Sequence, residues 1–79
     1  MALVKKLVKI QKSRTSIQEP TDCSYSIVTD SKGNKYLQFD STGSEKRKIK
    51  GKISQTLQFD RGALTQLAKI LKDKFNLNL

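Results

Sequence analysis

The chain has 79 residues, enough for one small domain, and a core of that size leaves apolar surface that a second copy would help to bury. Sixteen Lys and Arg against seven Asp and Glu give a formal net charge of +9, which favours a polyanionic partner and above all nucleic acid. Because the sequence has no His and a single Cys, we expect no histidine base, zinc cluster or internal disulfide, and hence neither an enzyme nor a bound metal or cofactor.

Residues 1–14 form a basic N-terminal segment. Lys5, Lys6 and Lys9 interrupt its apolar residues, so it resembles neither the apolar stretch of a signal peptide nor a membrane span. The apolar spacing fits a strand or a helix; we favour a strand, because strands follow, with a frayed basic arm as the alternative. We therefore expect a soluble, intracellular protein without a membrane partner, in which Cys23 is a reduced thiol of no assigned role.

Residues 15–23 are polar and contain the only proline, Pro20, which predicts a loop. Antiparallel strands are expected over residues 24–60. The first two form a hairpin, because alternating residues on either side of Gly33 place Leu37 and Phe39 on one face and Tyr36 on the other. Gly33 itself is free to adopt the positive φ that such a turn requires.

The tract from Lys46 to Phe59 predicts a further strand with two unlike faces. One parity carries Ile49, Ile53, Leu57 and Phe59, and the other carries Lys48, Lys50 and Lys52. At a rise of about 3.3 Å per residue, the ammonium groups of these lysines lie roughly 6.5 to 7 Å apart, which resembles the phosphate spacing of an extended single strand. An ordinary solvated run of charges is the alternative interpretation.

A helix is predicted over residues 61–75. Asp60 is placed to act as its N-cap, and Phe59 and Leu64 are placed to form a hydrophobic staple. One helical stripe, expected to face the core or a dimer interface, consists of Leu64, Leu67, Ala68, Leu71 and Phe75.

Basic residues on the expected sheet and its flanks are candidates for binding nucleic acid, and Tyr36 is the best placed aromatic ring for stacking on a base. Tyr25, which shares parity with Ile27, is expected to pack in the core. The candidate set is Lys5, Lys6, Lys9, Lys32, Lys35, Tyr36, Lys46, Arg47, Lys48, Lys50 and Lys52.

The order of these parts resembles the positive cofactor 4 family of transcriptional coactivators and single-stranded DNA-binding proteins. The resemblance rests on two stretches: Tyr25 to Phe39, with its Asp-x-Lys-Gly turn, and Lys50 to Ser54, followed by the apolar stripe of the helix. It implies an α+β fold, in which a curved four-stranded antiparallel sheet precedes one C-terminal helix, and a homodimer formed through helices and sheet edges. It also implies that Lys32, Lys50 and Lys52 contact unpaired DNA.

We therefore expect a single-stranded DNA-binding protein of little sequence specificity, acting in transcription, replication or recombination. An RNA- or ribosome-associated structural or interaction protein is the alternative of a different class. A sequence-specific repressor of the strand-helix-helix kind is disfavoured, because it needs two helices and the sequence predicts one. A catalytic role is disfavoured most, because no nucleophile is paired with a base.

Overall fold

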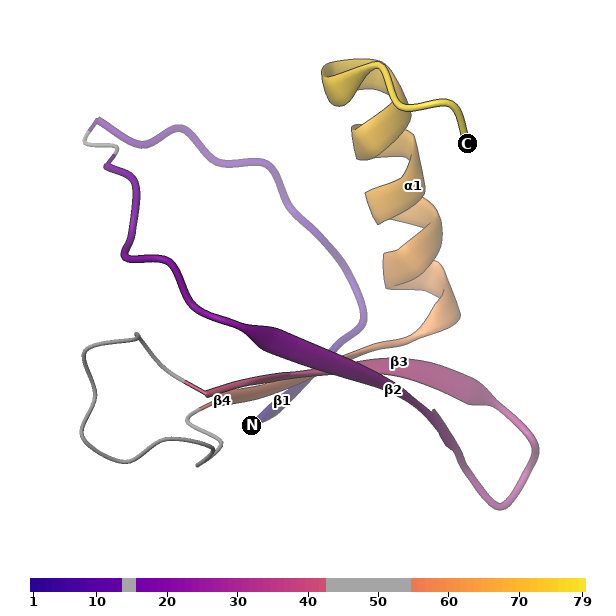
Figure 1. The fold of residues 1–79 in the computed structure, drawn as a ribbon. Helices are drawn as coiled ribbons and strands as arrows, with labels where there is room; N and C mark the ends of the chain where they lie inside the picture. Colours follow the sequence, from indigo (N-terminus) through magenta and orange to yellow (C-terminus); the bar gives the residue numbers. More distant parts are fainter. Residues whose placement is uncertain (14–15, 43–54) are drawn as a thin grey trace.

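The computed structural model describes residues 1–13, 16–42 and 55–79, and its strands and helix follow the order ββββα (Figure 1). The elements are β1 (Ala2–Val4), β2 (Cys23–Thr29), β3 (Lys35–Ser41), β4 (Gln55–Phe59) and α1 (Arg61–Phe75). The predicted α+β class, with a four-stranded sheet and one C-terminal helix, is confirmed.

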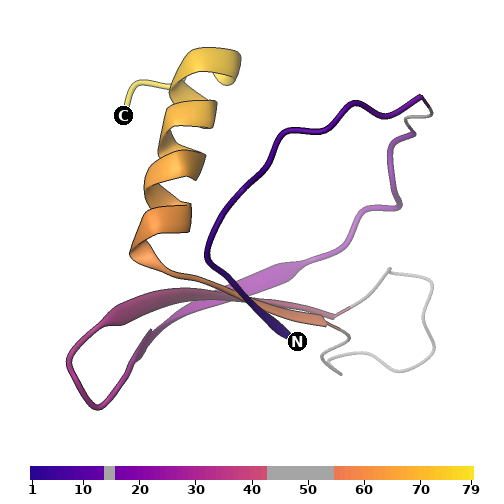
Figure 2. The same ribbon diagram turned by 180° about the vertical axis from the view of Figure 1, so that it is seen from behind.

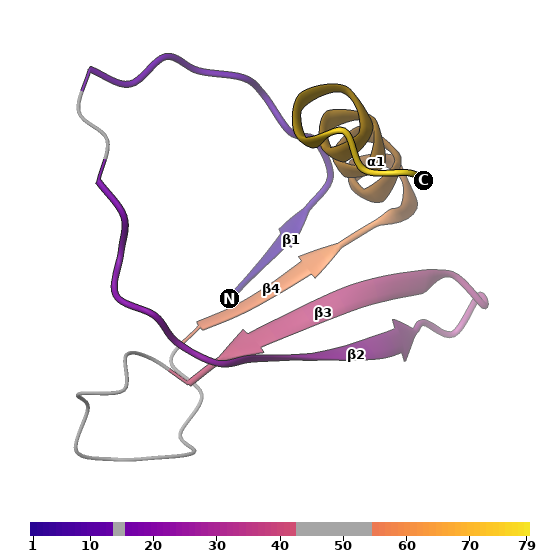
Figure 3. The same cartoon turned by 45° about the horizontal axis from the view of Figure 1, so that its top comes forward.

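The sheet has the strand order β1-β4-β3-β2 and is mixed rather than wholly antiparallel, as Figure 3 shows face-on. β2, β3 and β4 pair antiparallel as predicted, but β1 runs parallel to β4, with Ala2 beside Leu57 and Val4 beside Phe59. The connection from Val4 to Cys23 carries the chain from one edge of the sheet to the other. A tight hairpin can join only antiparallel strands, whereas a long connection such as this one allows a strand to pair in either direction.

Strand register gives the sheet one apolar and one polar face. Tyr25 lies opposite Phe39, and Ile27 lies opposite Leu37. Residues directly opposite each other project from the same face, and β4 continues the pattern. The apolar face therefore carries Tyr25, Ile27, Leu37, Phe39, Leu57 and Phe59, and the other face, polar except for Val28, carries Ser26, Val28, Tyr36, Gln38, Asp40, Thr56 and Gln58.

Helix α1 spans the range that the sequence predicts, Arg61–Phe75, and Asp60 is its N-cap as predicted. The Asp60 carboxylate accepts a hydrogen bond of 2.8 Å from the Ala63 amide, which satisfies one of the free N–H groups of the first turn. At the other end Asn76 adopts a left-handed conformation with φ of 54°. Lys72 and Lys74 in the last turn suit the negative end of the helix dipole.

The helix stands steeply on the sheet instead of lying along it, as two opposite views show (Figures 1 and 2). Leu64 in its first turn shares a cavity of about 330 Å³ with Ile27 and Leu37, which places the base of α1 on the apolar side. Further up, a side-chain amide, that of Gln66, donates to the Leu7 carbonyl and accepts from the Leu7 amide. This pair of bonds ties the N-terminal segment to the helix.

Few side chains of the described residues are buried, because the helix covers only part of the sheet. Among the described residues Ala63 alone is a buried hydrophobic residue, while Leu64, Leu67 and Leu71 are half-buried. Phe75, predicted to belong to a core or an interface, is 65% exposed and takes no part in a core of this single chain. Tyr25, predicted to pack in the core, is 73% exposed on β2, an edge strand of the sheet.

Candidate nucleic-acid interface

The β2–β3 turn is held by one carboxylate, which accepts four hydrogen bonds. Asp30 accepts from the backbone amides of Lys32 and Asn34, each at 2.9 Å, and from the Asn34 side-chain amide at 3.1 Å. The Tyr36 hydroxyl donates the fourth, at 3.0 Å. Gly33 completes the turn with φ of 86°, a left-handed conformation in which a side chain is strained. The turn thereby presents Lys32 and Lys35, both exposed, from a fixed backbone.

These bonds shift two acid–base equilibria. The hydrogen bonds from Asn34, the backbone one first, lower the pKa of Asp30 from its ordinary value of 3.8, because they stabilise the charged carboxylate. The bond to Asp30 raises the pKa of Tyr36, because ionising the phenol would remove its donated proton and place two negative charges side by side. Asp30 thus fixes both the turn and the hydroxyl end of Tyr36.

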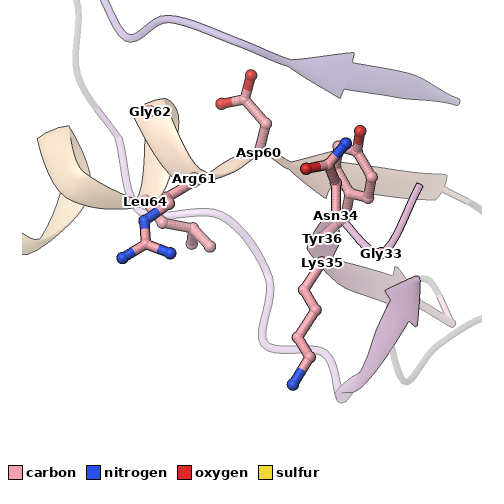
Figure 4. Close-up of a pocket in the computed structure, with 8 residues that line it drawn as sticks. All are labelled: Gly33, Asn34, Lys35, Tyr36, Asp60, Arg61, Gly62 and Leu64. Atoms are coloured by element: carbon pink, nitrogen blue, oxygen red, sulfur yellow. The ribbon is translucent and has the colours of Figure 1, made fainter. Parts of the chain in front are cut away.

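A pocket lies between this turn and the start of α1 (Figure 4). Its volume is about 680 Å³, and its lining residues are Gly33, Asn34, Lys35, Tyr36, Asp60, Arg61, Gly62 and Leu64. Two cations border it from different elements: Lys35 at the start of β3 and Arg61 at the start of α1. In Figure 4 their side chains extend to one side, whereas the Asp60 carboxylate is directed to the other.

Neither cation of the pocket is neutralised within the described part of the chain. Lys35 and Arg61 are both exposed and make no ion pair there. The one carboxylate in the lining, that of Asp60, caps the Ala63 amide. Within the described residues, the pocket therefore has two unpaired positive charges on its border, whereas the Tyr36 side chain projects from the face of β3 opposite to that of Lys35.

The sequence analysis did not name Arg61 as a site residue, although a cation in the first turn of the predicted helix is an unusual feature that could have drawn attention to it. The positive end of a helix dipole favours acidic residues in the first turn, and α1 has none there. A cation at this position interacts unfavourably with the helix dipole, typically by about 0.3–1 kcal/mol, so the charge of Arg61 does not stabilise the helix.

The structure brings together some of the predicted basic residues. Lys32 and Lys35 share the hairpin end that faces the pocket. Lys5 lies next to the pocket wall, since its carbonyl oxygen would be 3.7 Å from a Cβ added to Gly62. Lys6 and Lys9 are exposed along the same N-terminal segment. The remaining candidates, which lie outside the described residues, are Lys46, Arg47, Lys48, Lys50 and Lys52.

The polar face of the sheet carries a ladder of side-chain hydrogen bonds. Gln58 donates to Gln38 at 2.9 Å, Gln38 donates to the Asp40 carboxylate at 3.0 Å, and Thr56 donates to the same carboxylate at 2.6 Å. The bond from Thr56, with that from Gln38, lowers the pKa of Asp40. Asp40 therefore keeps a negative charge on this face, which disfavours phosphate close to it.

Three comparisons with known proteins returned nothing: no protein-family model, no curated protein and no solved structure matches this chain. The resemblance to the positive cofactor 4 family accordingly stays a prediction. No group of three or more potential metal ligands occurs within residues 1–13, 16–42 and 55–79. Over the same ranges, no helix has the length and apolar character needed to cross a membrane.

Proposed function

We propose that this chain binds single-stranded DNA with little sequence specificity and that the pocket between the β2–β3 turn and α1 holds part of the strand. The observation that carries the proposal is the pair of unneutralised cations, Lys35 and Arg61, on two sides of one pocket in a chain of net charge +9. Lys32 on the adjoining β2–β3 turn extends the positive surface in the direction that a bound DNA strand would follow.

A concave site favours an unpaired strand over a duplex. The pocket, at about 680 Å³, falls within the range of sites that enclose a small molecule, and a single nucleotide unit of a flexible strand can bend into it. A duplex presents its phosphates on a stiff outer surface and keeps its bases stacked inside. The amide and carboxylate ladder of the polar face is already internally bonded, so we expect no base readout there.

Anisotropy titrations test the proposal with a labelled oligothymidine, a duplex of the same length and the corresponding RNA, all at matched salt. We expect the single-stranded DNA to bind most tightly. Replacing both Lys35 and Arg61 by Ala should weaken binding across sequences and flatten the slope of log K against log salt by about 1.4, since each phosphate contact on a single strand contributes about 0.7.

A variant with both Lys69 and Lys72 replaced by Ala is the matched control, because it also removes two exposed positive charges, from α1, without touching the pocket. Its affinity and salt slope should stay close to those of the wild type. Tighter binding to the duplex would refute the preference for unpaired DNA. An unchanged salt slope in the variant of Lys35 and Arg61 would refute the placement of phosphate in the pocket, and tighter binding to RNA would point to the alternative class of function.

A further inference from the structure

The N-terminal segment is anchored at two points as it leaves β1 and passes beside α1 (Figure 3). At the first point, the Asp60 amide donates to the Val4 carbonyl at 3.2 Å, where the strand ends. At the second, the Gln66 side chain accepts from the Leu7 amide at 2.8 Å and donates to the Leu7 carbonyl at 3.2 Å. The backbone is therefore fixed at positions 4 and 7, against the end of β4 and the start of α1.

The bonds of Gln66 imitate those of a neighbouring strand. In an antiparallel sheet, one residue can bond through both its N–H and its C=O to the residue opposite. Here one side-chain amide makes both of these bonds to Leu7. Because they involve only backbone groups, they hold the path of the chain whatever side chain position 7 carries.

Two lysines lie between the anchors, next to the pocket. The Lys5 carbonyl oxygen would be 3.7 Å from a Cβ added to Gly62, which lines the pocket. The side chains of Lys5 and Lys6 are exposed and make no ion pair with the described part of the chain. A lysine on a fixed backbone loses less conformational freedom when it binds a phosphate than a lysine on a free arm. The two anchors therefore favour binding of an anion by these cations.

We propose that Gln66 is a positioning residue of the nucleic-acid interface. By holding Leu7 it fixes Lys5 and Lys6 beside the pocket, and so adds two cations to those that border the pocket itself. The proposal rests on the proposed function, since it concerns the same bound strand. Gln66 acts through the lysines and makes no contact of its own with the DNA.

A double-mutant cycle tests whether Gln66 acts in this way. Gln66→Met removes both hydrogen bonds, keeps the helix propensity and leaves the net charge unchanged. We expect it to weaken binding of the oligothymidine about fivefold or more, the cost of fixing roughly one residue during binding instead of before it. Replacing Lys5 and Lys6 together by Ala should weaken binding in the wild type, and less in the Gln66→Met background, because lysines that are not fixed contribute less. The control with Lys69 and Lys72 replaced by Ala should have the same small effect in both backgrounds.

Amide hydrogen exchange in the free protein gives a readout that does not involve DNA. In Gln66→Met the Leu7 amide should exchange faster, because its acceptor is gone, while the Leu64 amide, bonded to the Asp60 carbonyl at 2.9 Å, should keep its rate if the helix is intact. An unchanged rate for Leu7, or equal effects of the lysine pair in the two backgrounds, would overturn the role of Gln66 alone. A wild type that binds no oligothymidine would overturn the proposed function, and the positioning role with it, even with Leu7 held as described.

Discussion

Asp60 has two separable roles, and substitution can distinguish them. Its carboxylate caps α1 through the Ala63 amide at 2.8 Å, and it also lines the pocket in which we place a phosphate group. Asn is as good an N-cap as Asp but carries no charge. We therefore expect Asp60→Asn to retain the stability of the fold while binding single-stranded DNA more tightly than the wild type.

The size of the gain depends on the separation between the phosphate and the Asp60 carboxylate. If the phosphate were held roughly 6–8 Å from the Asp60 carboxylate, the two like charges would repel in water by about 0.5–0.7 kcal/mol. Removing the repulsion should lower the dissociation constant about two- to threefold at low salt. The gain should shrink as salt is added, because the Debye length falls to about 10 Å at 0.1 M.

Asp60→Ala isolates the capping role. Loss of an N-cap costs about 1 kcal/mol of folding free energy, which for a domain of this size lowers the melting temperature by about 4–8 °C. Thermal melts and anisotropy titrations on both variants provide the assays. If Asp60→Asn binds no more tightly than the wild type at low salt, the phosphate does not lie near Asp60 and the placement of the strand is wrong.

Two further predictions concern the predicted row of lysines and the carboxylates of the sheet and its turn. Replacing Lys48, Lys50 and Lys52 together by Ala should lower affinity for all single strands while circular dichroism stays unchanged; undiminished binding would show that this row, predicted from spacing alone, is an ordinary solvated surface. The fold should lose stability in acid: the pKa values of Asp30 and Asp40 are lowered from 3.8, so their contribution is complete above that pH and disappears as the pH falls through the lower folded values. Urea midpoints measured from pH 5 downward report this loss, and Asp40→Asn should make the decline shallower.

Local sequence signals predicted the elements well, because each depends on residues close together in the chain. The cap at Asp60, the turn at Gly33 and the alternation through Leu37 and Phe39 all follow from short-range sterics and hydrogen bonding, and the structure contains all three. The direction of β1 depends on pairing between Val4 and Phe59, far apart in sequence, and no local pattern determines it.

The candidate site was only partly predictable for the same reason. Lys35 and Tyr36 stand out because they adjoin a recognisable hairpin turn. Arg61 joins them only through the way β4 ends beside β3 and delivers the start of α1 to the turn, which is a property of the tertiary structure. Helical periodicity likewise cannot predict the steep angle between α1 and the sheet, because it indicates an apolar stripe but not the surface on which that stripe packs.

The parallel pairing of β1 with β4 also has a consequence for the order in which the strands are expected to pair during folding. The β2–β3 hairpin closes across a turn of a few residues, whereas pairing Ala2 with Leu57 closes a loop of about 55 residues at a higher entropic cost. We therefore expect the hairpin to form early and β1 to add last, completing the edge of β4 only after α1 is in place to hold Leu7 through Gln66. In this order, β2, β3 and β4 assemble first, and the N-terminal residues complete the sheet afterwards.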